Sequence, residues 1–588
     1  MNNSTKLIEK LFRDTLIIFF LSMFVSIIGY IIDATITGNF LGTKAIASLG
    51  MTLTYQKFTD IFPLIMMAGM QVLCSKSLSN GNLREANEIF SLAVTAALIV
   101  SVLMTGGTIL FSAQIADLLG ATEDLGEIRA LTIDFMEAYS LGLPAMALVT
   151  LLTPIMQLDN DRQRAVISAV LLSGCDVVGD LLAIFVFNGG LWEICLVTAI
   201  SYWITTGFLI LHFFKPNASF KFLPKAVSIK YLRETILIGL PSSLDRASSL
   251  FRVTFLARTA LALSGGVGVA AFAAVENFSG LLKTIIKSVG SSTRMIGGIL
   301  ISEHDRLSVL HLIKIALKYT LIITLPITAV GFFAAPTIAN FYIHSADPVT
   351  HRMTTEGIRL FIAYLPLQTL GSIFQYFYQA YGRFKLASCL SICDNFAFFV
   401  LMILLLTPHF GMASVWLAFP MSQVAYLLMI FFVTCYHCGR ITFKLEDYLL
   451  LPKNFDVPED KQLDITVTSE AEALDLSQRT QTFCESRGID ERRSMFTSIC
   501  IKEMAYNIVD YGFDDGKKHF IDIRFIVKDN RVIIRMRDNC RPFDPKKWEE
   551  IHNPVDPTEH IGIHLVSKMA TDFEYVNILK LNNLIIKL

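Results

Sequence analysis

Twelve apolar runs, each long enough to cross a lipid bilayer, occupy most of the chain before residue 440. A transmembrane helix needs about 20 predominantly apolar residues, and runs of that kind lie near 14–37, 46–74, 89–116, 130–156, 163–187, 190–214, 236–262, 268–300, 309–342, 355–380, 385–406 and 411–435. Only 17% of the 588 residues are charged, against about 25% in soluble proteins. The sequence therefore predicts an all-α membrane bundle of about 12 transmembrane helices, followed by a smaller soluble part.

The second six apolar runs repeat features of the first six at a constant distance. Gln157 recurs as Gln379 and Gly189 recurs as Gly411, and the members of each pair are 222 positions apart. Repeated halves are typical of secondary transporters, whose binding sites lie near the middle of the membrane. We therefore expect two six-helix repeats with a transport site between or within them.

The distribution of charge predicts the domain boundaries and the orientation. If the N-terminus is cytoplasmic, most Lys and Arg residues outside the apolar runs fall on the inner side, as the positive-inside rule requires. This predicts a multi-pass protein of the bacterial inner (plasma) membrane with both termini in the cytoplasm. The predicted segments are a first lobe (1–214), a cytoplasmic connector (215–235), a second lobe (236–440), a linker (441–462) and a cytoplasmic domain (463–588).

Asp33, Asp176 and Asp180 lie inside apolar runs of the first lobe. A carboxylate at membrane depth costs roughly 2.5–3.5 kcal/mol, so it is kept where it is paired or functional. Asp176 and Asp180 are one helical turn apart and repel each other, so at least one should hold a proton or share a cation. With Asp33 and Thr198 they predict a cation or proton site, because the positions 222 residues further on are apolar. The alternative is a set of protonated carboxyls bonded within the bundle, with Thr198 bonded to its own helix backbone.

The second lobe carries charges of its own within its apolar runs. Asp245, Arg252 and Arg258 lie in the seventh run, Glu276 in the eighth and Asp394 in the eleventh. One interpretation is an internal ion pair between Asp245 and Arg252, which are seven residues apart and share a helix face. The other is a substrate cavity suited to an anionic or zwitterionic compound.

The segment after residue 440 contains no spanning run and reads as a compact α+β domain. Ser469 stands at a helix N-terminus with Glu472 at capping-box spacing. Alternating apolar residues and turn signals predict strands. We predict helices at 469–487, 490–511 and 561–569, and strands at 464–467, 520–527, 531–537, 573–579 and 584–588.

Three short stretches of this domain carry polar residues suited to nucleotide chemistry. Glu503 and Asn507 share a helix face, where a carboxylate can act as a base and an amide oxygen can hold Mg²⁺. Asp538 directly follows a strand and can accept a hydrogen bond from an adenine amino group. Gly562 lets the N-terminus of a helix approach phosphate. Each stretch alone is also typical of a solvated surface.

The membrane part resembles the multidrug and toxic compound extrusion (MATE) family over about residues 8–437. The resemblance rests on Asp33-Ala-Thr-Ile-Thr-Gly-Asn-Phe-Leu-Gly42, Ser79-Asn-Gly-Asn82, Gln157 with Asp161, and the series Asp176, Asp180, Gly189 and Thr198. It implies a small-molecule antiporter whose first-half cation site consists of Asp33, Asp176, Asp180 and Thr198. Many members have Asn where Asp176 stands, so the coupling ion, Na⁺ or H⁺, stays open. A related branch flips lipid-linked precursors, which keeps a flippase as an alternative.

The C-terminal part resembles the ATP-binding (GHKL/Bergerat-type) fold of histidine kinases, gyrase and Hsp90 over about residues 463–588. It is most similar to the anti-sigma-factor serine/threonine kinase branch, through the stretches already given and Thr468–Leu474 and Asn582–Ile586. The resemblance implies ATP and Mg²⁺ as cofactors, Glu503 as the catalytic base, Asn507 as the Mg²⁺ ligand, Asp538 as the adenine reader and Gly562 in the phosphate loop. It also implies a cytoplasmic partner of the anti-anti-sigma type.

Two departures from that pattern affect the expected chemistry. Cys540 and His560 stand where the resemblance expects Gly, which narrows the backbone freedom of the loops over the nucleotide. The sequence thus predicts ATP binding more directly than ATP turnover, and whether the domain acts as a serine/threonine kinase stays open.

Together these features predict an ion-coupled efflux transporter with a fused ATP-binding regulatory or kinase-like domain. The alternatives are a transporter-fold receptor that signals through this domain, and a lipid-precursor flippase. We expect a small amphipathic or anionic substrate and contact with membrane lipid, and the net charge of −1 argues against nucleic acid as a partner.

Overall fold

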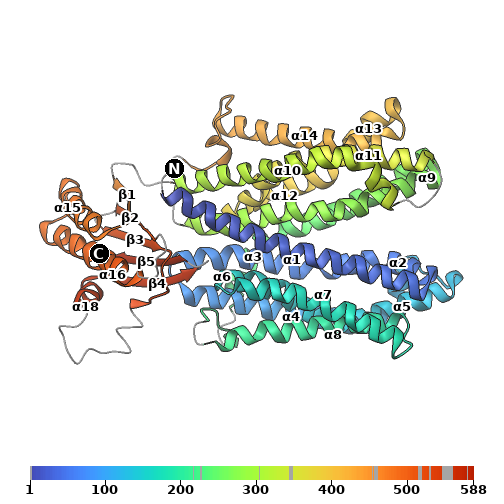
Figure 1. Cartoon of the computed structure of the whole chain (residues 1–588), viewed down its shortest axis with the longest axis horizontal. Helices are drawn as coiled ribbons and strands as arrows, with labels where there is room; N and C mark the ends of the chain where they lie inside the picture. Colours follow the sequence, from blue (N-terminus) through green and yellow to red (C-terminus); the bar gives the residue numbers. More distant parts are fainter. Residues whose placement is uncertain are drawn as a thin grey trace.

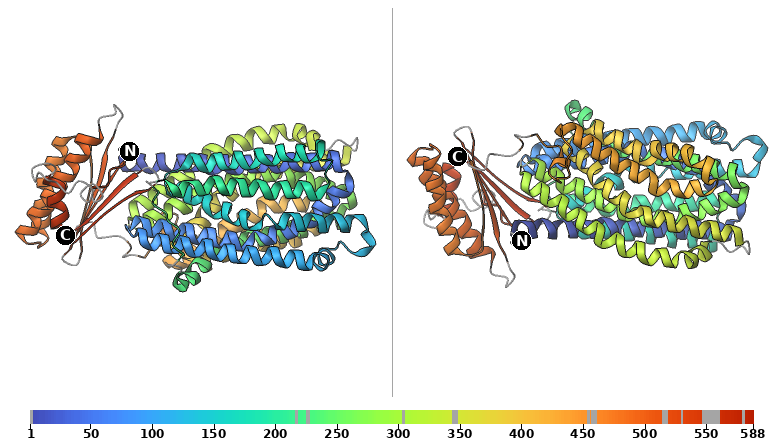
Figure 2. Two further views of the ribbon diagram at one scale, coloured as in Figure 1. Left: turned by 90° about the horizontal axis from the view of Figure 1, so that it is seen from below. Right: turned by 90° about the horizontal axis from the view of Figure 1, so that it is seen from above.

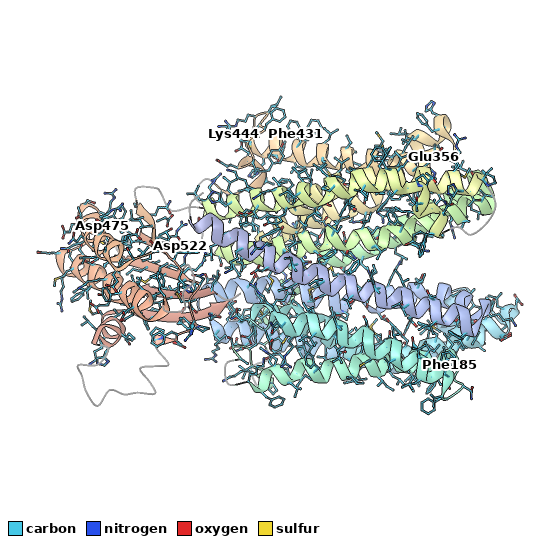
Figure 3. The ribbon with its side chains drawn as sticks, viewed as in Figure 1. Phe185, Glu356, Phe431, Lys444, Asp475 and Asp522 are labelled. Carbon is cyan, nitrogen blue, oxygen red and sulfur yellow. The ribbon has the colours of Figure 1, made fainter. Side chains whose placement is uncertain are left out.

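The computed structural model describes residues 3–215, 218–224, 228–302, 305–342, 348–452, 455, 461–513, 519–528, 531–545, 561–578 and 581–588. These residues form a bundle of long helices and a smaller domain at one end of it, here called the domain end (Figure 1). Phe185 of the first lobe and Glu356 of the second lie toward the opposite end of the bundle (Figure 3).

The first lobe contains eight α-helices, and they follow the six predicted spans with two interruptions. They are α1 (Asn3–Leu41), α2 (Thr43–Thr59), α3 (Ile61–Ser79), α4 (Leu83–Leu118), α5 (Glu127–Ser140), α6 (Leu143–Leu158), α7 (Arg162–Phe185) and α8 (Leu191–Ile210). The predicted spans 46–74 and 130–156 are each divided, the first near Asp60 and the second by a 51° bend between α5 and α6.

The second lobe is built from α9 (Leu232–Ser302), α10 (Arg306–Tyr342), α11 (Pro348–Tyr381), α12 (Phe384–Ile392), α13 (Phe398–Phe410) and α14 (Ala413–Cys438). A π-helical turn at Cys393–Ala397 joins α12 to α13. These two helices therefore form one bent span that corresponds to the predicted run at 385–406.

Helix α9 contains two of the predicted spans. Its 71 residues would extend about 106 Å at 1.5 Å per residue, more than three times the thickness of a bilayer core. Gly265 has φ 59°, a conformation that favours glycine, and a Cβ at Gly268 would lie 2.7 Å from the carbonyl oxygen of Ala260. The chain therefore folds back on itself at Gly265.

Ten helical segments within the described residues are long and apolar enough to cross a membrane, or eleven if the bent pair α5–α6 is counted as one span. The predicted number of twelve is reached only when α9 is divided at Gly265. The predicted helical membrane bundle is thus confirmed. The number of spans depends on whether α9 is counted as one span or as two.

The two lobes pack most closely through α3 and α9. A Cβ at Gly69 would lie 2.0 Å from the carbonyl oxygen of Thr235, and a Cβ at Gly239 would lie 1.9 Å from that of Ile65. The small residues therefore let two backbones touch. Nearer the domain end, Ser75 lies against Gly298, and Ser79 and Ser302 share a hydrogen bond. These contacts hold the lobes together in the half of the bundle nearest the domain.

The small domain is an antiparallel sheet with helices on one face. Its strands are β1 (Gln462–Val467), β2 (Ile521–Lys528), β3 (Arg531–Asp538), β4 (Asp572–Ile578) and β5 (Leu581–Lys587), in the order β1-β2-β3-β5-β4. Its helices are α15 (Glu470–Ser486), α16 (Glu491–Gly512) and α18 (Ile561–Met569). They cover the sheet on the side away from the bundle, and the strands lie between these helices and the bundle (Figure 2).

The elements of this domain lie close to their predicted bounds. The Ser469 hydroxyl accepts a hydrogen bond from the N–H of Glu472, as the capping pattern predicts. The Glu472 carboxylate reaches back one residue further than expected, to the N–H of Thr468 at 2.6 Å. The apolar face of the sheet and the helices share one core, to which Ile523, Ile534 and Met504 belong.

Candidate functional site

The three acids of the first lobe converge on one place in the bundle. Asp33 lies on α1, and Asp176 and Asp180 lie on α7, which packs against both α1 and α8. The carboxyl groups of Asp33 and Asp180 are close enough to interact, and so are those of Asp176 and Asp33. The Asp176 carboxyl also interacts with the hydroxyl of Thr198 on α8. The structure thus brings together all four residues that the sequence predicts as a cation or proton site.

A cavity of about 150 Å³ opens beside this group. Asp33, Asp176 and Thr198 contribute to its wall, whereas Asp180 is not part of the wall and is fully buried. Oδ1 of Asp33, Oδ1 of Asp176 and both carboxyl oxygens of Asp180 are buried without a hydrogen-bond partner among the described residues. Oxygen atoms left in this state are costly, and a proton or a hard cation would satisfy them.

Thr198 has the bond that the alternative interpretation predicts. Its hydroxyl donates to the carbonyl oxygen of Ile194 in the same helix, at 3.4 Å. The hydroxyl oxygen still has lone pairs directed away from that bond. Thr198 can therefore contribute an acceptor to the cavity while its proton stays on the helix.

The charged residues of the second lobe form a separate cavity of about 60 Å³. Asp245, Arg252 and Asp394 contribute to its wall, so three of the five predicted residues meet there. Glu276 lies beside it, with a carboxyl oxygen 3.9 Å from Nη2 of Arg252. Arg258 is exposed and is not part of this wall.

The ion pair between Asp245 and Arg252, one of the two interpretations of these charges, is not found in the part of the chain that the structure describes. Asp245 accepts a hydrogen bond from the side-chain amide of Asn395 at 2.7 Å. Glu276 instead lies between Arg252 and Lys283 and accepts from Lys283 Nζ at 2.5 Å. The prediction considered neighbouring turns of one helix, whereas the partners come from the π-helical turn and from the part of α9 beyond the Gly265 reversal.

The small domain contains a cavity of about 380 Å³, which is larger than the two lobe cavities already described. This is within the range of small-molecule pockets. Asn507 of α16 and Asp538 at the end of β3 contribute to its wall, and Tyr575 and Asn582 contribute from β4 and β5. The segment after β3 closes one side through Cys540, Arg541, Pro542, Phe543 and Pro545.

Asp538 is held in a defined orientation at this wall. Its Oδ1 accepts hydrogen bonds from Asn582 Nδ2 at 2.6 Å and from the N–H of Cys540 at 2.9 Å. Burial raises the pKa of the Asp538 carboxyl above its ordinary value, although both hydrogen bonds oppose the shift. A fixed carboxylate in an apolar pocket suits recognition of an amino group on a flat ring, so the residues present fit an adenine.

The other predicted nucleotide residues lie near this cavity. Glu503 is half-buried and lies one turn before Asn507 on α16, outside the residues that form the wall. Gly562 lies in the first turn of α18, and its neighbour Ile563 is part of the wall. His560 lies outside the described residues.

A chain of side-chain hydrogen bonds leads from Asp538 to the first lobe of the bundle. Asn582 donates to Asp538, and its Oδ1 accepts from Asn577 Nδ2 at 2.5 Å and from the Tyr575 hydroxyl at 2.6 Å. Asn160, in the turn between α6 and α7, donates to the carbonyl oxygen of Asn577 at 2.8 Å. The wall of the cavity is thus connected to a membrane helix turn through two asparagines.

The same domain also contacts the second lobe, through a buried ion cluster. Asp305, which precedes α10, lies 2.8 Å from Nη1 of Arg524 on β2 and 3.6 Å from Nη2 of Arg535 on β3. Burial would raise the pKa of Asp305, but the two guanidinium groups and the hydrogen bonds from Ser308 hold it below the ordinary value. Asp305 is therefore an anion at neutral pH, buried between the two parts.

An apolar contact accompanies these polar ones. Val576, at the end of β4 nearest the bundle, is buried within the same apolar cluster as residues of α3 and α6. The Glu574 side chain lies against Gly81 in the turn after α3. The β4–β5 hairpin is therefore packed onto the first lobe, while β2 and β3 contact the second.

Several of these residues were not predicted from the sequence. Tyr575, Asn577 and Asp305 carry no local signal, because a polar residue in a strand or loop is usually solvated. Asn582 was noted only as part of the resemblance. Lys287 also lies in the wall of the second-lobe cavity, and it was not predicted although a charge inside an apolar run is a signal in the sequence.

A family comparison covers the membrane bundle in two pieces. The family model MatE matches residues 19–182 and 241–404. The chain belongs to the MatE family. The two matched pieces are displaced by 222 positions, since 241 − 19 and 404 − 182 give the same number. This is the repeat distance that Gln157 and Gln379 indicate.

Solved structures similar to this MatE chain share its membrane fold. A MATE in complex with MaL6 aligns with a TM-score of 0.68 at 19% identity, covering 73% of this chain and 97% of that one. An outward-facing multidrug resistance MATE family transporter aligns with a TM-score of 0.67 at 19% identity, covering 72% and 94%. A MOP superfamily transporter from Pyrococcus furiosus, whose binding pocket of reverse polarity suggests a different function, aligns at 0.68 and 19%, covering 72% and 94%.

No curated protein matches the chain. The family match and the fold establish a multi-pass membrane protein with the fold of MATE multidrug-type transporters, which handle small molecules. The small domain lies outside both matched pieces.

Proposed function

We propose that this MatE protein is an ion-coupled antiporter, driven by Na⁺ or H⁺, whose C-terminal cytoplasmic domain binds ATP with Mg²⁺ and regulates transport. Asp33, Asp176 and Asp180 form the ion site, with Thr198 as an additional oxygen donor. The convergence of these three acids beside a cavity supports this half of the proposal. Their buried oxygens exchange a cation or proton for substrate when the two lobes alternate their access.

The nucleotide half of the proposal rests on the cavity of the small domain. Asp538 would hold the adenine amino group, and Asn507 would ligate Mg²⁺ on the side where Gly562 and α18 begin. ATP supplies a transferable phosphate, but the domain has no GxxxxGK[ST] loop of the kind that powers transport. Regulation is therefore the role we assign to it.

The observation that carries the regulatory role is the hydrogen-bond chain from Asp538 through Asn582 and Asn577 to Asn160. Asn582 engages Oδ1 of Asp538, so a ligand that binds the other oxygen of this carboxylate shares one acceptor group with the first bond of the chain. The domain is also bound to the second lobe through Asp305. Because alternating access moves one lobe relative to the other, a domain attached to both lobes restrains that movement.

The test compares variants of the full chain in proteoliposomes. Ion-driven transport of a dye panel containing ethidium and fluorescein is measured with and without MgATP inside the compartment that the domain faces. Asp180→Asn should abolish transport and keep MgATP binding measured by calorimetry. Asn507→Ala should keep basal transport and abolish both MgATP binding and its effect. Loss of transport in both variants, or in neither, contradicts this division of roles.

A receptor is the second candidate, and the same contacts favour it. A domain bound to both lobes can report which conformation a ligand stabilises, just as it can restrain that conformation. In that case ligand binding would change phosphate transfer from ATP to a serine hydroxyl of a partner protein, releasing ADP, without ion flux. Glu503 would be the base. Ligand-dependent phosphorylation in the Asp180→Asn variant would favour the receptor over the antiporter.

A further inference from the structure

The cavities of the two lobes have opposite charge. The charged residues in the wall of the first-lobe cavity are acidic, Asp33 and Asp176. The wall of the second-lobe cavity carries four cations against the acids Asp245 and Asp394; the cations are Arg246, Arg252, Lys283 and Lys287. A cation site and an anion site therefore lie in different halves of one duplicated bundle.

Each acid near the second-lobe cavity already has a partner. Asp394 accepts from Gln423 at 2.5 Å, and Asp245 accepts from Asn395. Asp60 of the first lobe lies 2.9 Å from Nη2 of Arg246. With Glu276 bound to Lys283, the carboxylates of this region are committed to other groups.

Two of the cations are left with incomplete partners. Arg252 is 1% exposed, and its Nε and Nη1 have no hydrogen-bond partner among the described residues. Its ion-pair partner, Glu276, is 3.9 Å away and is shared with Lys283. The other nearby carboxylate, Asp394, is bonded to Gln423. Lys287 is half-buried in the same wall, and no ion pair to it is found in the described part of the chain. Buried cations in this state are costly unless an anion completes them.

We propose that the second-lobe cavity binds the anionic group of the transported compound, a carboxylate, sulfonate or phosphate, through Lys287 and Arg252. Guanidinium and ammonium groups are the side chains that proteins use for such oxyanions. Asn395 and Gln368, also in the wall, supply neutral hydrogen-bonding groups. The transporter thus pairs an anion subsite in one lobe with a cation or proton site in the other.

The inference deepens the proposed transport function and depends on it for its physiological meaning. It is tested at equilibrium, with the full chain in neutral phosphatidylcholine nanodiscs and without an ion gradient or ATP. Fluorescence anisotropy measures binding of the anionic dye fluorescein and the cationic dye ethidium. Wild type should bind fluorescein saturably, and Lys287→Gln should weaken that binding about tenfold or more, since it removes a charge-assisted bond.

Three further variants define the result. Lys287→Arg should restore fluorescein binding, because it restores the charge. Arg258→Gln removes an exposed charge from the same helix as Arg252 and should bind like wild type. Asp180→Asn should abolish gradient-driven transport, and adding Lys287→Gln to it should still lower fluorescein affinity about tenfold or more, so that loss of transport is separated from loss of the anion subsite.

The origin of the anion is resolved by a second arm. Nanodiscs containing phosphatidylglycerol supply a lipid phosphate, and competition with fluorescein would identify a lipid headgroup as the occupant. Absence of competition would identify a soluble anion. The proposal is overturned if fluorescein does not bind saturably, if Lys287→Gln binds it as wild type does, or if ethidium binds more tightly than fluorescein and displaces it.

Discussion

Asn160 donates a hydrogen bond to the carbonyl oxygen of Asn577 across 2.8 Å, although the two residues are 417 positions apart in the chain. Asn160 lies in the turn between the membrane helices α6 and α7. Asn577 is two residues from Tyr575, which is part of the wall of the small domain's cavity. Two further hydrogen bonds lead from Asn577 through Asn582 to Asp538, the candidate adenine-binding residue. The contact between Asn160 and Asn577 provides the most direct test of coupling between the two parts.

Removal of the Asn160 side chain should uncouple the domain from the first lobe. Asn160 has φ 62°, which Gly adopts freely, so Asn160→Gly removes the side chain without backbone strain. Loss of the bond should cost about 1 kcal/mol of docking energy. Hydrogen exchange should become faster in β4 and β5, and basal transport should persist while its response to MgATP is lost. Unchanged exchange in these strands would contradict the contact.

Neutralisation of Asp305 should detach β2 and β3 from the second lobe. Asp305→Asn removes the carboxylate charge that the second lobe contributes to Arg524 and Arg535, while Asp464 stays 3.8 Å from Arg524 Nε. Breaking one side of a buried ion pair costs about 3–5 kcal/mol. Asn retains the side-chain cap of α10 that Asp305 provides to Ser308. Limited proteolysis within the linker 441–462 should therefore become faster. Lys314→Gln, a charge change further along α10, is the control.

The docking contact should also be sensitive to strong acid. The folded-state pKa of Asp305 is lowered from 3.8, so its stabilising effect is complete above that value and is lost as the pH falls through the folded pKa. The contribution of Asp305 to docking should thus be equal at pH 7 and pH 5 and should weaken only below about pH 4, whereas Asp464, whose pKa burial raises to about 6, takes up its proton between those two pH values. Proteolysis of the linker with an acid-active protease follows this change. Loss of docking already between pH 7 and pH 5 would assign the contact to other groups.

Nucleotide affinity should decrease on mild acidification because of Asp538. Its pKa is raised by burial, so the carboxylate that would accept from adenine takes up a proton at a higher pH than an ordinary Asp would. Calorimetry of the full chain with MgATP should show weaker binding as the pH approaches that raised value from above. Asp538→Ala should bind poorly at every pH. An affinity of wild type that is independent of pH would exclude Asp538 as the adenine reader.

Ion-driven transport should depend on the acidic residues buried in the first lobe and not on acidic residues at the surface. Asp180→Asn removes a fully buried carboxyl from the convergent group and should abolish gradient-driven transport of the dye panel. Asp124→Asn, an exposed acid after α4, should leave transport within about twofold of wild type. Equal transport by both variants would remove Asp180 from the ion site.

Much of the architecture was predictable because it is encoded locally. Spanning length, the 222-residue offset and the alternation of the C-terminal strands are patterns of neighbouring residues, and the helices and strands follow them closely. The acids Asp33, Asp176 and Asp180 were predictable as a group because a carboxyl in an apolar run is too costly to be incidental.

The contacts between distant segments were decided by the tertiary structure alone. The sequence placed Asp245 and Arg252 on one helix face. In the structure, Asn395 from the π-helical turn bonds Asp245, and Glu276, which lies beyond the Gly265 reversal of α9, approaches Arg252, so the expected ion pair is replaced. Asp305 and Asn160 lie in loops between membrane helices, and only the packing of the small domain against them shows their contacts. Local periodicity fixes which face of an element is buried, whereas the identity of its partner depends on how whole elements pack. The sequence thus determined the two lobes, the acids and the C-terminal domain, and only the packing decided how these parts are joined.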